Sequence, residues 1–520
     1  MNMKPDVIID KVNDTYIKIR TDTSIEKHIY ETFSFTTPKM KYHPKVKARL
    51  WDGYIHLYNY NTKQIYLGLL EDLVKFFNKF NYSYQFTFSK VDNYDEELLN
   101  EAKKLIEPKY ELMDHQKEII DFSIKNNRGV IISATSSGKS LSIYTLVMYY
   151  LLKEKNKILI VVPRTSLCEQ MKKDFIEYHN GDKESFSEEI DVIYNGSKRN
   201  DGHIKICTWQ SLQNFEKEYF SDIDVIMVDE CHNSKAKELT NILELCSNSP
   251  HKFGFTGTLS NKDDIDVNEM VLRGLFGRTK EFITSKELID RGHATQTTIT
   301  CIKLNYSNKS VCDHVMKGTE AIRNIKNYTE KRKKLYENEI EYIINSDTRN
   351  SYVSEFALKT KGNTIVMFHY EEHGKKLFET ISSKAEEYGK QVYLIYGNVK
   401  TSVRENIRDI TEKNENVIIV ASYGTTAVGV NIKRLHNMIL AGGFKGEIVT
   451  RQTIGRMLRL HEDKDCARIY DIGDDFSQGK TNKNFSYVHF LKRVEIYREQ
   501  QFDIKAYEYH IEPKNGKLDD

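Results

Sequence analysis

Short apolar runs alternate with longer amphipathic segments along two successive stretches of the chain. In the first stretch, from about residue 105 to 290, runs of strand length are separated by segments with helical spacing. These runs are Gly129–Ser133, Ile158–Val162, Ile204–Thr208, Val225–Val228 and Phe253–Thr256. The alternation predicts a parallel sheet flanked by helices, with ligand-binding groups gathered at the carboxyl ends of the strands.

A second series of the same kind follows towards the C-terminus. Its strand-length runs are Thr364–Phe368, Val392–Ile395, Val417–Ala421, Met438–Ala441 and Arg468–Asp471. Between the two series, residues 308–360 form a charged helical stretch that contains the basic run Lys331–Lys334. That run fits a solvated helix face as well as it fits a contact with nucleic acid.

The N-terminal residues, up to about 90, have a third pattern. Alternation around residues 7–20, a helix from Ser24, strands near 53–60 and 64–70, and an amphipathic helix from Glu71 predict a small α+β unit. The expected architecture is therefore α/β: a small α+β domain (1–95), two tandem parallel-sheet domains (105–295 and 296–475) and a C-terminal helical extension (476–520).

Composition narrows the class of protein. The 520 residues, 39% of them hydrophobic, suffice for about three globular domains. The longest apolar runs are of strand length, far short of the roughly twenty residues that a membrane span needs. The start, MNMKPDVIID, carries charges where a secretion signal has its apolar core. We therefore expect a cytoplasmic protein that has no membrane partner.

Charge and cysteine content narrow the class further. The formal net charge is +2, so any contact with nucleic acid must come from local basic patches. The seven cysteines are scattered without a C-x-x-C pair. This distribution argues against a zinc site or a disulfide framework and fits a reducing compartment.

A candidate phosphate loop follows the first strand of the first series. The segment Ser133–Ser140 ends that strand and opens a helix, so its backbone N–H groups are expected to cradle phosphates. Lys139 is expected to neutralise charge on the β- and γ-phosphates, and Ser140 to coordinate Mg²⁺. The nucleotide-binding residues expected here are Ser136, Ser137, Gly138, Lys139 and Ser140.

Two carboxylates follow the apolar run 225–228. Asp229 is expected to hold hydrated Mg²⁺ and Glu230 to orient the attacking water, which together with the phosphate loop indicates an NTP-hydrolysing site. Far downstream, Q-x-x-G-R-x-x-R contains Arg456 and Arg459, whose spacing predicts that both lie on one helical face. Arginines supplied from a second domain would couple hydrolysis to domain motion.

Further motifs in order make the chain resemble superfamily 2 helicases. Gln116 resembles the glutamine that reads the adenine edge in that family. Two segments are similar to those that touch the nucleic-acid backbone, and their expected contact residues are Pro163, Arg164, Thr208 and Gln210. Thr256-Gly257-Thr258 resembles the motif that links hydrolysis to strand movement.

The second series extends this resemblance. Gly424–Asn431 is similar to the segment that lies near both DNA and ATP, and Thr425 is its expected DNA contact and Gly429 its expected nucleotide contact. Arg456 and Arg459 match the closing arginines. The resemblance implies two RecA-like domains that bind ATP and Mg²⁺, with Lys139, Asp229, Glu230 and the two arginines as catalytic residues.

A closer resemblance is to the UvsW family of recombination helicases of T4-like bacteriophages. Trp51–Leu57 is similar to the W-D-G-x-I-x-L of that family's small N-terminal domain, and Ala421–Gly424 and Gln452–Arg456 also match. The resemblance implies an ATP-dependent DNA helicase that unwinds or branch-migrates recombination intermediates, stalled forks and R-loops. Its implied setting is phage replication, recombination and repair in the host cytoplasm. We expect a monomer, with recombination or single-strand-binding proteins as partners.

The N-terminal unit has a basic segment of its own. Its basic residues alternate, which places them on one side if the chain is extended. They are Lys39, Lys41, His43, Lys45, Lys47 and Arg49, followed by Trp51, Tyr54, Tyr58 and Tyr60. The basic groups would track phosphates and the aromatic rings would stack on splayed bases at a junction. The alternative is the solvent face of a strand with core tyrosines.

Other functions use the same motifs. A double-strand translocase or annealing motor would need no strand separation, and an RNA-dependent ATPase would differ only in its polymer. A binding protein with a decayed motor is disfavoured because Lys139, Ser140, Asp229 and Glu230 are all present.

Overall fold

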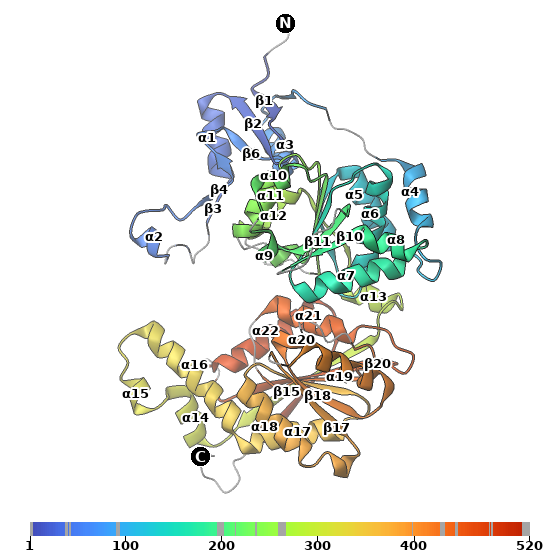
Figure 1. Ribbon diagram of the computed structural model, residues 1–520. Helices are drawn as coiled ribbons and strands as arrows, with labels where there is room; N and C mark the ends of the chain where they lie inside the picture. Colours follow the sequence, from blue (N-terminus) through green and yellow to red (C-terminus); the bar gives the residue numbers. More distant parts are fainter. Residues whose placement is uncertain are drawn as a thin grey trace. The chain divides into compact units, whose positions relative to one another are not determined.

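Figure 1 shows the computed structural model of the chain, which folds into two compact units. Unit 1 comprises Met1–Ala134 and Gly138–Ile283, and unit 2 comprises Thr135–Ser137 and Thr284–Asp520. The structure describes residues 4–36, 40, 43–89, 94–194, 202–213, 215–233, 237–257, 267–397, 399–426, 432–442, 446–477, 479 and 482–511.

The N-terminal part of unit 1 is a small α+β domain, as predicted. Its main sheet has the order β5-β6-β2-β1-β7. Asp22 caps α1 by accepting hydrogen bonds from the backbone N–H groups of Ser24 and Ile25, which explains where this helix begins. The elements are β1 (Val7–Lys11), β2 (Tyr16–Thr21), α1 (Thr23–Thr32), β3 (Ser34–Phe35), α2 (Pro44–Lys47), β4 (Ile55–His56), β5 (Tyr58–Asn59), β6 (Gln64–Tyr66), η2 (Leu67–Leu69), α3 (Leu70–Lys79) and β7 (Tyr84–Phe86).

The rest of unit 1 is the first α/β domain, built on a seven-stranded parallel sheet of order β10-β11-β9-β12-β13-β8-β14. All the strands expected from apolar runs are present, and β10 and β14 extend the sheet at its two edges. The elements are α4 (Glu96–Lys104), α5 (Asp114–Asn126), β8 (Arg128–Ser133), α6 (Lys139–Leu152), β9 (Ile158–Val162), α7 (Thr165–Tyr178), α8 (Lys183–Glu188), β10 (Ile190–Ile193), β11 (Ile204–Thr208), α9 (Trp209–Leu212), α10 (Lys217–Ser221), β12 (Val225–Asp229), η3 (Cys231–Asn233), α11 (Lys237–Leu245), β13 (His251–Thr256), α12 (Val267–Phe276) and β14 (Thr279–Ile283).

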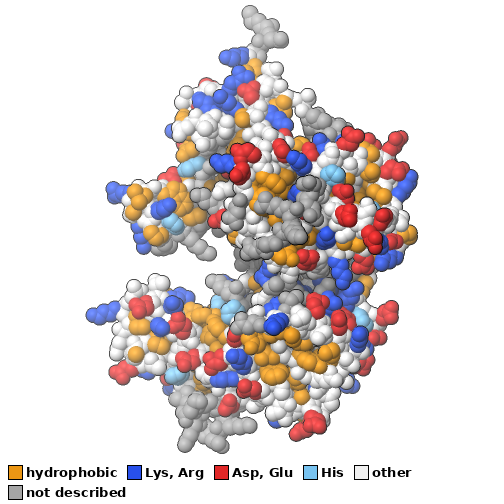
Figure 2. All heavy atoms as spheres, in the orientation of Figure 1, with side chains coloured by type: hydrophobic (Ala, Val, Ile, Leu, Met, Phe, Trp, Pro, Cys, Tyr) orange, Lys and Arg blue, Asp and Glu red, His pale blue; other side chains and the backbone are white. Residues whose placement is uncertain are grey.

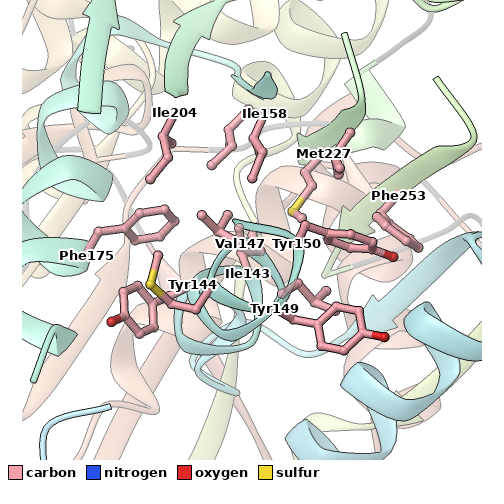
Figure 3. Close-up of a cluster of buried hydrophobic side chains, with 14 of the residues drawn as sticks. Ile143, Tyr144, Val147, Tyr149, Tyr150, Ile158, Phe175, Ile204, Met227 and Phe253 are labelled. Carbon is pink, nitrogen blue, oxygen red and sulfur yellow. The ribbon is translucent and has the colours of Figure 1, made fainter. Parts of the chain in front are cut away.

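Helix α6 is the centre of the core of this domain. Its side chains from Leu141 to Tyr150 are all buried, because the sheet, α5 and α7 surround it. Figure 3 shows Tyr144, Val147 and Tyr150 of this helix among side chains of the central strands. Burying large side chains on every face anchors the helix that follows the phosphate loop.

The N-terminal domain packs on the edge of the first α/β domain where β8 and β13 begin. Lys252 is fully buried there, and its Nζ donates to Thr15 Oγ1 at 2.8 Å and to the Leu243 carbonyl at 3.0 Å. Arg128 donates to the Asp14 carbonyl at 2.8 Å. A Cβ on Gly68 would lie 2.2 Å from the Arg273 carbonyl oxygen, so only glycine permits this close approach.

Unit 2 contains the second α/β domain, whose seven-stranded parallel sheet has the order β17-β18-β16-β19-β20-β15-β21. Its elements are α13 (Ser285–Asp290), β15 (Gln296–Tyr306), α14 (Lys309–Lys317), α15 (Glu320–Arg323), α16 (Tyr328–Asn345), α17 (Asp347–Lys359), β16 (Thr364–Phe368), α18 (Glu371–Ser382), η4 (Glu386–Tyr388), β17 (Gln391–Ile395), α19 (Thr401–Lys413), β18 (Val417–Ser422), α20 (Tyr423–Thr426), β19 (Asn437–Leu440), α21 (Glu447–Met457), β20 (Cys466–Asp475), α22 (Phe485–Glu499) and β21 (Asp503–Ile511).

The C-terminal segment 476–520, expected to be helical, is only partly so. After α22 the chain forms β21, which pairs in parallel with β15 at the sheet edge. Most side chains of β21 are exposed, so its sequence lacks the apolar run that identified the central strands. Within the described part of the chain, no helix has both the length and the apolar composition of a membrane span.

Buried ion pairs fasten the helices of unit 2 to β20. Arg349 of α17 donates to both carboxylate oxygens of Asp474, at 2.7 and 2.9 Å, and Arg493 of α22 does the same with Asp471, at 2.9 and 2.7 Å. All four side chains are buried. Tyrosine hydroxyls add hydrogen bonds, from Tyr306 to Asp474 and from Tyr497 to Asp471.

Candidate functional site

Adjacent strands of the first α/β domain bring the sequence motifs to one edge of the sheet. In the register of the sheet, Asp229 of β12 lies opposite Phe255 of β13, and Thr256 of β13 lies opposite Ile132 of β8. The phosphate loop follows β8 directly. The carboxyl ends of these three strands therefore gather the loop, the two carboxylates and Thr256-Gly257, as expected for a parallel sheet. Thr258 lies outside the described residues.

Gly138 and Gln116 determine the shape of the phosphate loop. Gly138 precedes α6 with φ 76°, in the left-handed region, and a Cβ there would lie 2.4 Å from Gln116 Nε2. Gln116 Nε2 donates to the Gly138 carbonyl at 2.9 Å, while the Met113 N–H donates to Gln116 Oε1 at 2.8 Å. Gln116, predicted to read adenine, therefore lies directly against the loop.

Lys139 and Ser140 occupy the first turn of α6, where a helix N-terminus favours anions. Lys139 Nζ donates to the carbonyls of Ser133 and Ala134, at 3.0 and 3.3 Å, so the ammonium group lies over the loop. Ser140 Oγ is 3.3 Å from the Tyr178 hydroxyl. The loop also contains Ser136, whose φ of 71° is left-handed. This arrangement fits a bound polyphosphate.

Asp229 ends β12 and is followed by Glu230 with φ 52°. The N–H of Glu230 donates to Asp229 Oδ1 at 3.0 Å. Burial and repulsion from the Glu230 carboxylate raise the pKa of Asp229 to about 6, against the opposing effect of Lys139. A carboxylate in these surroundings gains from a nearby cation, so the pair fits the ligand set that Mg²⁺ prefers.

Glu230 is connected to β13 through His232. His232 is buried, and its Nδ1 is 3.2 Å from Glu230 Oε2 and 2.7 Å from Thr256 Oγ1. Burial alone would raise the pKa of Glu230, but the nearby His232 imidazole, the charge of Lys139 and a hydrogen bond from the Gly257 backbone outweigh it and lower the pKa. Glu230 is thus held ionised, the state that a water-orienting carboxylate needs.

The sequence motifs assigned no role to His232. The structure places it between Glu230 and Thr256, so it joins the segment with the two carboxylates to the segment resembling the coupling motif. Its position, two residues after Glu230, is the one sequence feature that could have identified it as part of the site. Tyr178, beside Ser140, had no such signal, because it lies thirty-eight positions away at the end of α7.

The residues predicted to touch nucleic acid in the first domain follow β9 and β11. Arg164 is exposed and immediately precedes α7, next to Pro163. Thr208 is buried and caps α9 by accepting a hydrogen bond from the Ser211 N–H at 3.3 Å, so its hydroxyl already has a structural role. Gln210 is exposed on α9.

The prediction that both arginines share one helical face is wrong. Helix α21 ends at Met457, so Arg456 lies in its last turn and Arg459 lies beyond it. The cause is Thr295, whose N–H donates to the Leu458 carbonyl at 2.8 Å and whose hydroxyl donates to the Arg459 carbonyl at 2.7 Å. Thr425 belongs to α20. Gly429 lies outside the described residues.

The basic segment of the N-terminal domain is helical where an extended chain was expected. Lys45 and Lys47 lie on α2, and Arg49 follows it with φ 56°. His43 caps this helix and Pro44 occupies its first turn, a position that suits proline because its missing N–H would have no intrahelical partner. The three basic side chains are nevertheless exposed, and Lys39 and Lys41 lie outside the described residues.

The aromatic residues after this segment differ in role. Trp51 Nε1 donates to the Tyr54 carbonyl at 2.8 Å, and its ring packs edge-on against His43 at 5.4 Å, so it holds the loop together. Tyr58 is fully buried and donates to Glu26, which contradicts a base-stacking role. Tyr54 and Tyr60 remain exposed.

Comparison with known proteins covers all three domains. Residues 6–87 match the family described as DNA helicase UvsW, N-terminal, residues 89–261 the res subunit of type III restriction enzymes, and residues 348–461 the helicase conserved C-terminal domain. The ATP-dependent DNA helicase uvsW of Enterobacteria phage T4 is 31% identical over 96% of this chain and 98% of its own length.

Two solved structures also align with most of the chain. The crystal structure of T4 UvsW aligns over 97% of this chain and 99% of its own, with 26% identity and a TM-score of 0.48. The type ISP restriction-modification enzyme LlaBIII, bound to DNA, aligns over 86% of this chain and 36% of its own, with 13% identity and a TM-score of 0.53. The likeness to LlaBIII indicates a shared fold.

Proposed function

This chain belongs to the UvsW family of ATP-dependent DNA helicases, and from that premise we propose that it unwinds or branch-migrates branched DNA. The substrates would be recombination intermediates, stalled forks and R-loops, in phage replication, recombination and repair. The observation that carries the proposal is the convergence of Lys139, Asp229 and Glu230 at one edge of the first sheet. Hydrolysis there would supply the energy for strand movement.

The nucleotide site has distinct roles for its residues. Backbone N–H groups of Ser136, Ser137 and Gly138 would cradle the phosphates, Lys139 would neutralise their charge, and Gln116 would contact adenine. Ser140 and Asp229 would hold Mg²⁺, which when bound would neutralise charge that develops on the phosphoryl oxygens. Glu230, kept ionised by His232 and Gly257, would orient the attacking water.

The second domain would contribute arginines to the same reaction. Arg456 and Arg459 are permanent cations with planar donor groups that suit a transferring phosphoryl group. Gly429 would approach the nucleotide. Because Arg459 lies beyond α21, its reach depends on the segment fastened by Thr295 and not on the helix itself.

DNA contacts would be distributed over both domains and the N-terminal domain. Arg164 and Gln210, with Pro163 and Thr208 beside them, would follow the backbone of one strand, and Thr425 would contact it from the second domain. A further set in the N-terminal domain would recognise branched DNA: Lys45, Lys47, Arg49 and Trp51.

The setting follows from the proposed substrates. The protein would act in the host cytoplasm, as a monomer in solution, alongside phage recombination or single-strand-binding proteins. RNA–DNA hybrids would be substrates where an R-loop has to be removed.

A panel of nucleic acids tests this proposal. ATPase and strand-displacement rates are measured on single-stranded DNA, linear duplex, forks, Holliday junctions, R-loops and RNA, with Lys139→Ala as the inactive control. We expect ATP-dependent displacement on forks and junctions that exceeds displacement on linear duplex. ATPase activity without any displacement would instead indicate a double-strand translocase, and equal stimulation by RNA alone would indicate an RNA-dependent ATPase.

A further inference from the structure

The basic run Lys331–Lys334 is divided by the structure into two halves. Lys333 and Lys334 lie 3.8 and 2.7 Å from the carboxylate oxygens of Glu337, one turn further along α16. All three side chains are exposed. Ion pairs at this spacing occur commonly on solvated helix faces and contribute little. Lys333 and Lys334 therefore form solvent-exposed ion pairs of a common kind, and they need no nucleic-acid contact to explain them.

In the other half of the run, Arg332 contacts Tyr328. Tyr328 and Arg332 are one turn apart on α16, and Arg332 Nη1 donates to the Tyr328 hydroxyl at 3.2 Å. The guanidinium carbon lies 5.8 Å from the centre of the Tyr328 ring and 5.2 Å from that of Phe485 on α22. Tyr328 is 72% exposed. An aromatic ring and a cation are thus held together on the surface.

Helix α15 joins this group. Lys331 Nζ donates to the Arg323 carbonyl at 2.8 Å, which fastens the start of α16 to α15. Arg323 and Lys326 are exposed beside it. We call residues 320–332 the α15–α16 tip. Figure 1 shows it at the edge of unit 2, away from the central strands, and Figure 2 shows Lys and Arg side chains along that edge.

We propose that the α15–α16 tip binds a single DNA strand. The ring of Tyr328 stacks on an unpaired base, and Arg332, Arg323 and Lys326 contact phosphates on either side. Sites for single strands combine these two elements, because every base has a stacking face and every nucleotide carries a charge. Basic side chains outnumber Glu320 and Glu330 in the tip, so its charge suits a polyanion.

The geometry favours a single strand over a duplex. Paired bases are stacked on one another and hide their faces, so a protruding ring gains a partner only where a base is unpaired. The inference rests on the proposed helicase function and adds to it a strand contact in the second domain. Tyr328 should accordingly matter for single strands and forks, and much less for linear duplex.

Binding of fluorescent oligonucleotides to the full chain tests the tip. Tyr328→Ala should weaken single-strand binding by about 5- to 150-fold, the range of one base–aromatic stack. Tyr328→Phe should retain binding because the ring remains. Arg332→Gln should flatten the salt dependence, lowering the slope of log K against log salt by about 0.7 for one lost phosphate contact.

The matched control is Lys333→Ala with Lys334→Ala, which removes two charges from the same helix. It should bind DNA within about twofold of the natural chain, since these lysines already pair with Glu337. The proposal is overturned if Tyr328→Ala binds normally or if the control loses as much affinity. Wild-type unwinding, measured in parallel, reports on the proposed function separately, because the tip can bind a strand whether or not unwinding occurs.

Discussion

The two α/β domains have equivalent seven-stranded parallel sheets but use their strand carboxylates in opposite ways. In the first domain, Asp229 accepts a hydrogen bond from its neighbour's backbone, and burial raises its pKa to about 6. In the second domain, Asp471 and Asp474 are buried, and each accepts two hydrogen bonds from an arginine and one from a tyrosine.

The two sets of carboxylates differ in how many of their hydrogen-bond acceptor sites the protein already fills. A carboxylate has about four sites for hydrogen-bond donors, and those of Asp471 and Asp474 are largely occupied by protein. Asp229 keeps capacity for a cation, and its raised pKa means that a cation bound nearby would stabilise its ionised form. Equivalent folds thus leave a buried carboxylate with room for a ligand in one domain, and carboxylates whose acceptor sites are filled by protein in the other.

The largest expected effect concerns the two carboxylates at the end of β12. Glu230→Gln should lower ATP turnover by about 10² to 10⁴, because the amide cannot orient water as a carboxylate does. Binding of a fluorescent ATP analogue and of DNA should persist. Steady-state ATPase assays with Glu238→Gln as the control, a substitution at an exposed position of α11, make the comparison. Turnover near the wild-type rate would remove Glu230 from the mechanism.

The second prediction concerns the structural strand. Asp474→Asn leaves the buried guanidinium of Arg349 without its counter-ion, and should lower the free energy of unfolding by about 3 to 5 kcal/mol. Glu508→Gln, whose side chain is 64% exposed beside Lys303, should cost about 1 kcal/mol or less. Thermal and denaturant unfolding measure both. An equal loss of unfolding free energy in the two variants would mean that burying the Arg349–Asp474 pair makes it no more important for stability than an exposed pair.

The third prediction concerns Lys252, a buried cation whose hydrogen bonds go to a hydroxyl and a carbonyl and not to a carboxylate. Burial lowers the pKa of Lys252 to about 7, and the charge of Arg128 acts in the same direction. The folded pKa lies below the unfolded value of 10.5, so the unfolded chain binds more protons between these pH values and stability rises with pH there.

Lys252→Met should remove this pH dependence. Relative to the variant, the natural chain should gain about 2 kcal/mol between pH 7 and pH 9. Denaturant unfolding at both pH values measures the difference, and Lys117→Met, at the exposed pair with Asp114, serves as the control. Parallel pH profiles for the natural chain and Lys252→Met would show that the lysine keeps its charge when buried.

The sequence predicted the central strands and the motifs at their ends because both depend on local patterns. Apolar runs identify buried parallel strands, and the phosphate loop and Asp229-Glu230 are contiguous segments. Edge strands such as β21 were missed because exposed side chains leave no apolar run. The pair Arg349–Asp474 was also missed, because its members are 125 residues apart.

Two incorrect predictions have specific physical causes. Period-two alternation in the segment with Lys45 and Lys47 suggested an extended chain, but His43 and Pro44 are start signals for a short helix. The prediction that Arg456 and Arg459 share a helical face was wrong because the helix ends before Arg459. Thr295, far away in sequence, donates hydrogen bonds to the carbonyls of Leu458 and Arg459 at that end. Local caps can be identified from sequence, whereas distant hydrogen bonds cannot.

The smallest expected effect is on DNA binding. It concerns exposed basic side chains, in contrast to the buried carboxylates of the two α/β domains. Lys45, Lys47 and Arg49 are exposed around α2, and Figure 2 shows Lys and Arg side chains on that part of the N-terminal domain. Replacing all three with alanine should weaken fork binding by about tenfold and flatten its salt dependence, because each lost phosphate contact removes about 0.9 from the slope on duplex DNA.

Point substitutions test this domain better than its deletion, because deletion would uncover buried Lys252 and half-buried Arg128 and disturb the first α/β domain. Lys27→Ala with Lys75→Ala, at exposed positions of α1 and α3, controls for loss of charge alone. Basal ATPase activity should be unchanged in both variants, since neither touches the nucleotide loop. If the triple variant binds and migrates forks as well as the control does, these three charges do not contact DNA, and substrate choice belongs to the two α/β domains.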